Sequence, residues 1–404
     1  MKFPQLGPAC LVTAAFIGPG TVITASLAGA DYGFSLLWAL LFSMVVTISL
    51  QEMAARLGIV TQKGLAENIR EACSSRVLKV AIGSLIMIAI VIGNGAYQSG
   101  NILGASLGLS HLFSDGYLYS QISIWPLLIS LIAFIILFKG NYQFIERSLM
   151  CLVGLMSMAF LVTFILTKPE LKLFFSGLLI PRIPAGASLT IIALIGTSVV
   201  PYSLFLHSSI VSKKWHKSDD LLLARKDIFV SIPLGGLISI AIVSTAAMAF
   251  FGKGIAIINA ADLAPSLTPI MGEYSSVFIA IGLVTAGLSS ALTAPLAAAF
   301  ALSEILNLSR DLHSISFKVI WGGIILIGAL ISSADYEPIR VIFLAQIANG
   351  ILLPLVTLFL LWIMNTEKLG AYKNGWFGNI SAVIIFCVTL VLSARSLFIV
   401  FDKM

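Results

Sequence analysis

The chain has 404 residues, of which 59% are hydrophobic and only 10% are charged. A soluble globular protein carries about 25% charged residues, so this composition excludes a soluble enzyme, a disordered regulator and a secreted disulfide scaffold. The net charge of +6 does not indicate a nucleic-acid partner, because the basic residues lie in short segments between apolar runs, as topology signals do. The four cysteines have no spacing typical of a metal site. We expect a protein of the lipid bilayer without a cofactor.

The predicted elements are membrane-spanning helices. A helix needs about 20 mostly apolar residues to cross the hydrocarbon core, and about eleven runs meet this requirement. In chain order they are 9–30, 35–55, 78–107, 122–138, 146–166, 187–212, 227–252, 276–305, 316–333, 339–363 and 377–400. Their uniformly apolar texture favours helices, because the strands of a barrel would alternate. The longest connections lie near 167–186 and 253–275, and we expect a short surface helix in the second.

The distribution of Lys and Arg predicts the orientation. If the N-terminus is cytoplasmic, most of the 24 basic residues fall in cytoplasmic segments, as the positive-inside rule requires. The C-terminus is then outside. The first apolar stretch contains Gly18-Pro19-Gly20 and runs on into a span, so we expect no cleavable signal peptide. Without long tails or targeting segments, the chain is expected in a bacterial inner membrane.

Two predicted spans contain helix-breaking sequences. The first holds Gly18-Pro19-Gly20, and the sixth holds Pro201 within Gly196–Ser203, among small polar residues. One such sequence alone would indicate a kink, because proline lacks an N–H and glycine is permissive. Two of them, five spans apart, are what an inverted repeat of five plus five spans produces. Unwound backbone inside a membrane must be buried or line a wet cavity, so we expect the substrate site at the two breaks.

The residues around these breaks resemble a known family. Segment 14–60, from Ala-Ala-Phe-Ile-Gly-Pro-Gly-Thr through Leu-Gln-Glu-Met-Ala-Ala-Arg-Leu-Gly, resembles the start of Nramp-type (natural resistance-associated macrophage protein) metal-ion transporters. Val200–Ser208 in span six, Gly287–Ser290 in span eight, and Gln346 with Leu353-Pro354 in span ten are similar to the same family. The resemblance covers nearly the whole chain and keeps the order of its elements.

The resemblance implies a fold and an activity. The fold would be leucine-transporter-like, an all-α integral membrane protein with broken helices one and six. The chain would form a single transmembrane domain, 1–404, with repeat one at about 9–166, repeat two at about 187–363 and an extra helix at about 377–400. The activity would be secondary active transport by alternating access, and the protein would not be an enzyme.

The sequence departs from the family at the metal site. The family motif in span one is Asp-Pro-Gly-Asn, and its Asp and Asn bind the metal; here Gly18 and Thr21 take those positions. Val200 replaces the metal-binding Met before the proline of span six, and Tyr202 replaces the His after it. The second His is kept as His207. Both metal-binding side chains of span one and the soft sulfur are therefore missing.

The third span departs as well. The family has an Asp and, three residues on, a Glu tied to proton movement, and Asn94 and Tyr97 stand in their places. Together with His207, these residues are candidates for a water or proton path. Oxygens on span eight could bind Na⁺ as a coupling ion. The candidates there are Thr285, Ser289 and Ser290.

The lack of Asp and Glu at the predicted site indicates which ion that site can bind. A dehydrated divalent cation strongly prefers carboxylate oxygens, and its transfer from water without a counter-charge is very costly. Half-helix N-termini carry positive partial charge and free N–H groups, and hydroxyls could complete a shell around a small oxyanion. The candidate substrate-binding residues are Gly18, Gly20, Thr21, Thr24, Thr197, Ser198, Val200, Tyr202, Ser203 and Gln346.

Three function classes remain open. The first, which this charge argument favours, is a transporter of a small anion such as bicarbonate, with Na⁺ or H⁺ coupling. The second is a transporter of Mg²⁺ or Mn²⁺ that carries a largely hydrated ion, since Mg²⁺ dehydrates reluctantly. The third is a membrane enzyme, which would need a nucleophile with a base or a cluster of metal ligands. The spans contain no such constellation of His, Asp and Glu.

Overall fold

A computed structural model describes residues 17–113, 117–119, 122–140 and 143–402, and most of them are helical. The first elements are α2 (Pro19–Tyr32), α3 (Leu37–Thr61), α4 (Leu65–Ala72), α5 (Arg76–Phe113), β1 (Tyr117–Tyr119), β2 (Ile122–Ser123), α6 (Ile124–Lys139), α7 (Gln143–Thr167) and α8 (Leu171–Leu179). The next are α9 (Ser188–Ser198), α10 (Pro201–Lys214), η1 (Ser218–Asp220), α11 (Leu221–Phe250), η2 (Ala261–Ser266), α12 (Thr268–Met271) and η3 (Gly272–Tyr274). The last are α13 (Ser275–Ile305), α14 (Ile315–Ser332), α15 (Pro338–Ile363), η4 (Glu367–Tyr372) and α16 (Trp376–Asp402).

The helices follow the apolar runs of the sequence. Within the described ranges, 9 helical segments are long and apolar enough to cross a membrane, with α9 and α10 taken as one segment. α6 is a shorter apolar helix, and α2 covers the second half of the first predicted span. Residues 9–16 of that span lie outside the described residues. The expected surface helix between 253 and 275 takes the form of three short pieces, η2, α12 and η3.

The break predicted in span six is confirmed. α9 ends at Ser198, Val199 and Val200 are not helical, and α10 begins with Pro201 at its first turn. A proline at that position has the right φ and needs no N–H partner. α2 likewise begins at Pro19, after Gly18 in an extended conformation (φ −96°, ψ −179°). Both half-helices therefore start at a proline.

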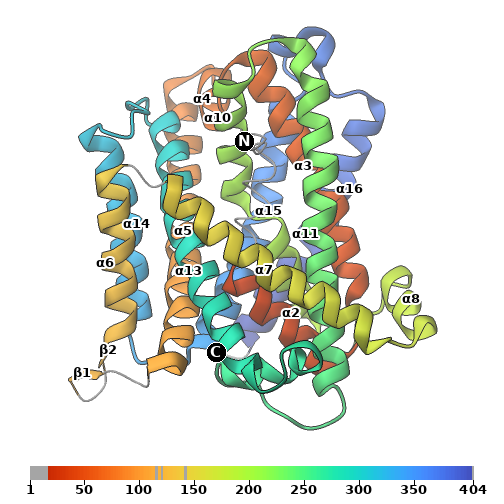
Figure 1. Ribbon diagram of the computed structural model, residues 1–404. Coiled ribbons are helices and arrows are strands. Elements are labelled where there is room, and N and C mark those ends of the chain that lie inside the picture. The colour runs from red at the N-terminus through yellow and green to blue at the C-terminus, as the bar shows by residue number, and fades with distance from the viewer. Residues whose placement is uncertain (1–16, 114–116, 120–121, 141–142, 403–404) are drawn as a thin grey trace.

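The long helix α5 runs through the bundle and packs against α13, α14 and α15, while α2 packs against α11 and α9. α10 lies against α3. Figure 1 shows α4 and η4 at one end of the bundle, called here the α4 face, and the β1–β2 hairpin at the other end. The extents of the two repeats and the sidedness of the termini stay predictions, because no membrane or partner defines them.

Candidate functional site

The start of α2 lies against α5, α13 and α15. A Cβ placed on Gly18 would be 2.9 Å from the Ser290 hydroxyl oxygen and 3.6 Å from the Tyr97 hydroxyl oxygen. A Cβ on Gly20 would overlap the side-chain amide of Gln346. The absence of side chains at these two glycines therefore lets three polar side chains from three helices reach the first break.

The second break meets the same groups. The ring of Tyr202, on the first turn of α10, lies 5.3 Å from the ring of Tyr97 between centroids. The Tyr97 hydroxyl shares hydrogen bonds with Tyr202 and Ser290. Behind the break, Gly196 of α9 is so close to α15 that an added Cβ would overlap the Gln346 carbonyl oxygen. Gln346 thus touches one break with its side chain and the other with its backbone.

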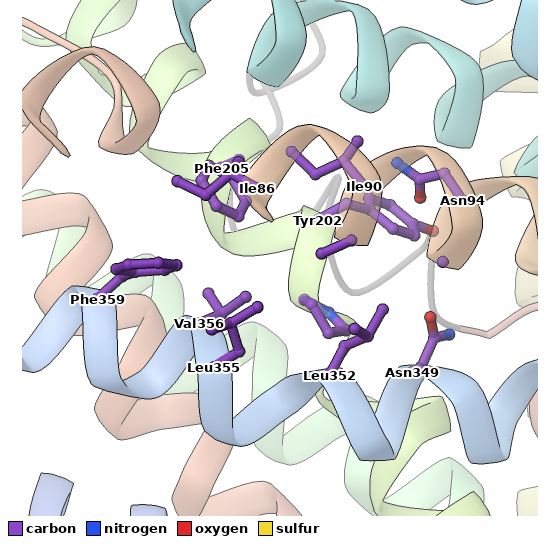
Figure 2. A pocket seen from close by; sticks show the side chains of 13 residues that line it. Ile86, Ile90, Asn94, Tyr202, Phe205, Asn349, Leu352, Leu355, Val356 and Phe359 are labelled. Atoms are coloured by element: carbon purple, nitrogen blue, oxygen red, sulfur yellow. The ribbon is translucent and has the colours of Figure 1, made fainter. Parts of the chain in front are cut away.

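A pocket opens beside the second break, between α5, α10 and α15 (Figure 2). Most of its lining is apolar, and Ile86 of α5 and Phe359 of α15 lie at one end of it. Asn94 and Asn349 gather at the opposite end, near Tyr202. Neither amide atom of Asn94, nor the Nδ2 of Asn349, has a hydrogen-bond partner among the described residues. These amides are available to a water or an ion.

The other predicted residues of spans one and six are buried but face different neighbours. Thr24 has a hydroxyl without a partner among the described residues, and Thr21 is buried on the same helix. The Thr197 hydroxyl donates to the Leu194 carbonyl, 2.9 Å away, within its own helix. Ser203 and Ser198 both contact α3. Gln51 donates to the Ser203 hydroxyl at 3.1 Å, and Thr47 donates to the Ser198 carbonyl at 3.3 Å.

Of the predicted coupling-ion residues, the structure brings Ser290 to the first break. The hydroxyl of Thr285 donates to the Ile281 and Gly282 carbonyls of its own helix, at 2.9 and 3.0 Å. Ser289 is buried on α13. His207 is fully buried on α10, and neither of its ring nitrogens has a partner in the described part of the chain.

The polar side chains that the structure describes at the two breaks are uncharged, and most of the adjoining pocket is apolar. Among the described residues, there is no group of three or more His, Cys, Asp and Glu that could hold a metal ion. The side chains at the breaks are hydroxyls and amides, which can bind an ion only through their dipoles. They lack a nucleophile with an adjacent base, so the arrangement favours binding and release over covalent chemistry.

Asn349 lines the pocket beside the second break and was not predicted from the sequence. Thr47 and Gln51 of α3, which contact the second break, were not predicted either. A single amide or hydroxyl in an apolar helix has no sequence signal of its own, since such residues usually mediate helix packing. The spacing of Asn349 three residues after Gln346 was the one available hint, because residues three apart share a helix face.

Comparison with known proteins identifies the family. Residues 9–399 match the model of the natural resistance-associated macrophage protein-like (Nramp) family. A protein of Verminephrobacter eiseniae named divalent metal cation transporter MntH is 28% identical over 413 residues, with 98% of this chain and 89% of that protein covered. Its namesake in Bacillus subtilis is 27% identical, with 99% and 92% covered.

Solved structures have the same fold. The Eremococcus coleocola manganese transporter, in complex with an aromatic bis-isothiourea substituted compound, superposes with a TM-score of 0.76 at 20% identity, covering 96% of this chain and 85% of that one. MhsT in complex with L-phenylalanine superposes with a TM-score of 0.65 at 16% identity, covering 98% of each. The predicted leucine-transporter-like fold is thereby confirmed. With the family model matched from residue 9 to residue 399, the chain belongs to the Nramp family and is a multi-pass membrane transporter, not an enzyme.

Proposed function

We propose that this transporter carries a divalent metal cation, Mg²⁺ or Mn²⁺, that keeps most of its hydration water. The names of the similar proteins support a divalent cation. The lack of charged side chains among the described residues at the breaks supports an ion that keeps its hydration water, and this is the observation that carries the proposal. Hydroxyls and amides cannot offset the charge of a stripped divalent ion, whereas Mg²⁺ binds readily through its waters. This reverses the preference for bicarbonate that the sequence alone suggested.

Free acceptor atoms at the breaks suit such an ion. The waters of a hydrated cation point their hydrogens outward, so they need oxygen acceptors. Gln346 Oε1 and Asn94 Oδ1 have no partner among the described residues, and both lie beside the breaks. A hydrated ion that donates to these oxygens would satisfy buried polar atoms that are otherwise costly.

Bicarbonate remains the second candidate, because one observation favours it. Two half-helices, α2 and α10, begin at the breaks, and helix N-termini attract anions. No carboxylate at the described part of the site would repel an anion. The two candidates therefore make opposite predictions for an added negative charge.

The test is uptake into proteoliposomes, with Mg²⁺ and Mn²⁺ influx and radiolabelled bicarbonate uptake measured in parallel at alkaline pH, with and without a Na⁺ gradient. Saturable metal influx without bicarbonate uptake is the expected result. The reverse result would overturn the proposal in favour of the anion. Dependence on the Na⁺ gradient would identify Na⁺ as the coupling ion, and a repeat of the assay with an imposed pH gradient tests H⁺ in the same way.

Gly18→Asp sharpens the distinction. The new carboxylate would point at Ser290 and Tyr97, in the middle of the site. Metal influx should be retained, or its apparent affinity raised by about tenfold, the effect of roughly 1.4 kcal/mol of added attraction. An anion transporter should instead lose its uptake. Gly18→Asn is the matched control, because it adds the same volume without the charge.

We further propose that the protein lies in a bacterial inner membrane with its N-terminus and the α4 face in the cytoplasm. The basic residues of the segments around α4 and η4 support this orientation. Single cysteines introduced at Lys217 and at Glu273, on opposite sides in this topology, should differ in labelling by a membrane-impermeant reagent on intact cells. Labelling of the cysteine at position 217 alone would show that the protein has the opposite orientation.

A further inference from the structure

A second, smaller pocket lies between α3, the end of α9 and α11, next to the break in span six. It is separate from the pocket of Figure 2 and shares no lining residue with it. Its lining contains four hydroxyl side chains from the three helices. The described residues that line it are Leu40, Ser43, Met44, Thr47, Ser198, Ile232, Gly235, Gly236 and Ser239.

The four hydroxyls have already committed their protons. Ser43 donates to the Leu40 carbonyl at 2.9 Å. Thr47 shares its one proton between the Ser43 carbonyl, at 2.6 Å, and the Ser198 carbonyl, at 3.3 Å. Ser198 donates to the Leu194 carbonyl at 3.4 Å, and Ser239 to the Gly235 carbonyl at 3.2 Å. A hydroxyl has one proton and two lone pairs. The oxygens of all four side chains are thus left with lone pairs to offer.

The end of α9 adds to this negative potential. Ser198 is the last residue of that helix, and the carbonyls at a helix C-terminus carry a partial negative charge. Among the described lining residues there is neither a basic nor an acidic side chain. Anions would meet only lone pairs, and a dehydrated divalent cation would lack carboxylates. A monovalent cation matches a pocket of neutral oxygens.

We propose that this pocket binds a monovalent cation of the size of Na⁺, and that the bound cation ties α3 and α11 to the end of α9. Thr47 already bridges two of these helices through the Ser198 carbonyl, so a cation there would set how the break in span six is held. Its role as a coupling ion rests on the proposed transport function, but its binding does not. The location differs from the span-eight residues that the sequence suggested for Na⁺.

The experiment measures the melting temperature of the purified full chain in detergent, titrated with NaCl, with choline chloride and with sodium gluconate at constant ionic strength. Saturable stabilisation by both sodium salts, and none by choline chloride, is the expected result. Stabilisation that follows chloride, or equal stabilisation by all three salts, would overturn the proposal.

Three variants locate the cation. Ser43→Ala and Ser239→Ala each remove one oxygen, and each should weaken the apparent Na⁺ affinity by about tenfold or more, the loss expected for roughly 1.4 kcal/mol. Ser49→Ala is the matched control, because its hydroxyl lies on α3, bonds to the Val45 carbonyl at 2.9 Å and does not line the pocket. Unchanged Na⁺ affinity in both pocket variants would overturn the location, and melting without Na⁺ verifies that each variant is folded.

The readout separates this proposal from the transport proposal. The Na⁺-dependent shift in melting temperature needs no transported substrate. A Na⁺ shift that is lost in the pocket variants, in a protein that moves no metal ion, would leave the cation pocket standing and the proposed substrate wrong. Metal influx without any Na⁺-dependent shift in melting temperature would support the proposed substrate and overturn the cation pocket.

Discussion

The α4 face and the two breaks handle polarity in opposite ways. At the α4 face, the carboxylate of Glu304 is fully buried at the end of α13 and is held by Ser209 of α10, at 2.5 Å, and by Arg310, at 3.4 Å. At the breaks, the polar groups are hydroxyls and amides, and several amide atoms have no partner in the described structure. Among the described residues, ion pairs hold helix ends together at the α4 face, whereas the polar groups at the proposed binding site are neutral hydroxyls and amides.

A second ionic cluster on the α4 face repeats this use of charge. Glu52 pairs with Arg56 on the same helix, at 3.1 Å, and with Arg225 of α11, at 2.8 Å. Arg56 also donates to the Tyr372 carbonyl and to Asn374, at 2.9 and 2.7 Å. Glu52 thereby joins α3 to α11, and Arg56 joins α3 to the segment after α15. In the described structure, ion pairs thus fix helix ends around two breaks whose polar side chains are neutral.

The largest expected effect is the loss of the partner of a buried charge. Arg310→Met leaves the Glu304 carboxylate buried without its ion pair and should lower the free energy of unfolding by about 3 kcal/mol. Adding Glu304→Gln to this variant should restore most of the lost free energy of unfolding. Arg340→Met is the control, because its pair with Glu337 is exposed, and it should change stability by less than about 0.5 kcal/mol. Equal losses in the two single variants would contradict the contrast.

The next effect tests the close packing behind the breaks. Gly196→Ala places a methyl group against the backbone of α15, at the Gln346 carbonyl and 2.7 Å from the Gly350 nitrogen. Overpacking of this kind costs about 1–3 kcal/mol. Chemical denaturation in detergent measures it. Gly154→Ala in α7 is the matched control, because its Cβ would meet nothing within 4 Å; a similar loss there would show that the effect is not one of packing.

The smallest effect concerns an exposed ion pair on the α4 face. The ammonium of Lys63 beside Glu71, with that of Lys368, holds the pKa of the Glu71 carboxyl below its usual value. A lowered carboxyl pKa stabilises the folded state above the ordinary pKa, and the stabilisation is lost as pH falls through the lowered value. Glu71→Gln should therefore cost less than about 1 kcal/mol at pH 7.

As the pH falls through the lowered pKa of Glu71, the same Glu71→Gln substitution should cost still less, because the wild-type carboxyl becomes protonated. Melting curves of both proteins at pH 7 and at steps through the acid range measure the difference. Salt should reduce the cost at pH 7, since exposed pairs are screened. A cost that grows as the pH falls would contradict the assigned direction of the pKa shift.

The spans were predictable because the bilayer imposes a length and an apolar composition on each helix. The break at Pro201 was predictable from proline chemistry. α4 and the β1–β2 hairpin were not predicted, because they are too short to leave a periodic pattern. The end of a helix can be predicted from the local sequence where one residue type, such as proline, determines it.

The site was predictable only in part. Gly18, Gly20 and Gln346 were predicted to bind the substrate; the structure brings them together, and their role in binding stays a prediction. That Ser198 turns toward Thr47 of α3 could not be foreseen, because the facing helix is determined by tertiary packing. The deep burial of Glu304 was equally hidden, since a carboxylate near a span end usually reaches water.

The length of α6 has a consequence for the surrounding lipid. Its 16 residues span about 24 Å, less than the roughly 30 Å of an average hydrocarbon core. The bilayer must thin beside this helix, or Lys139 must extend its ammonium to the headgroups. α6 packs directly on α5, the helix that carries Tyr97 to the first break. A thicker bilayer would therefore load the contact between α6 and α5, next to the proposed binding site, and acyl-chain length in proteoliposomes becomes a variable to control.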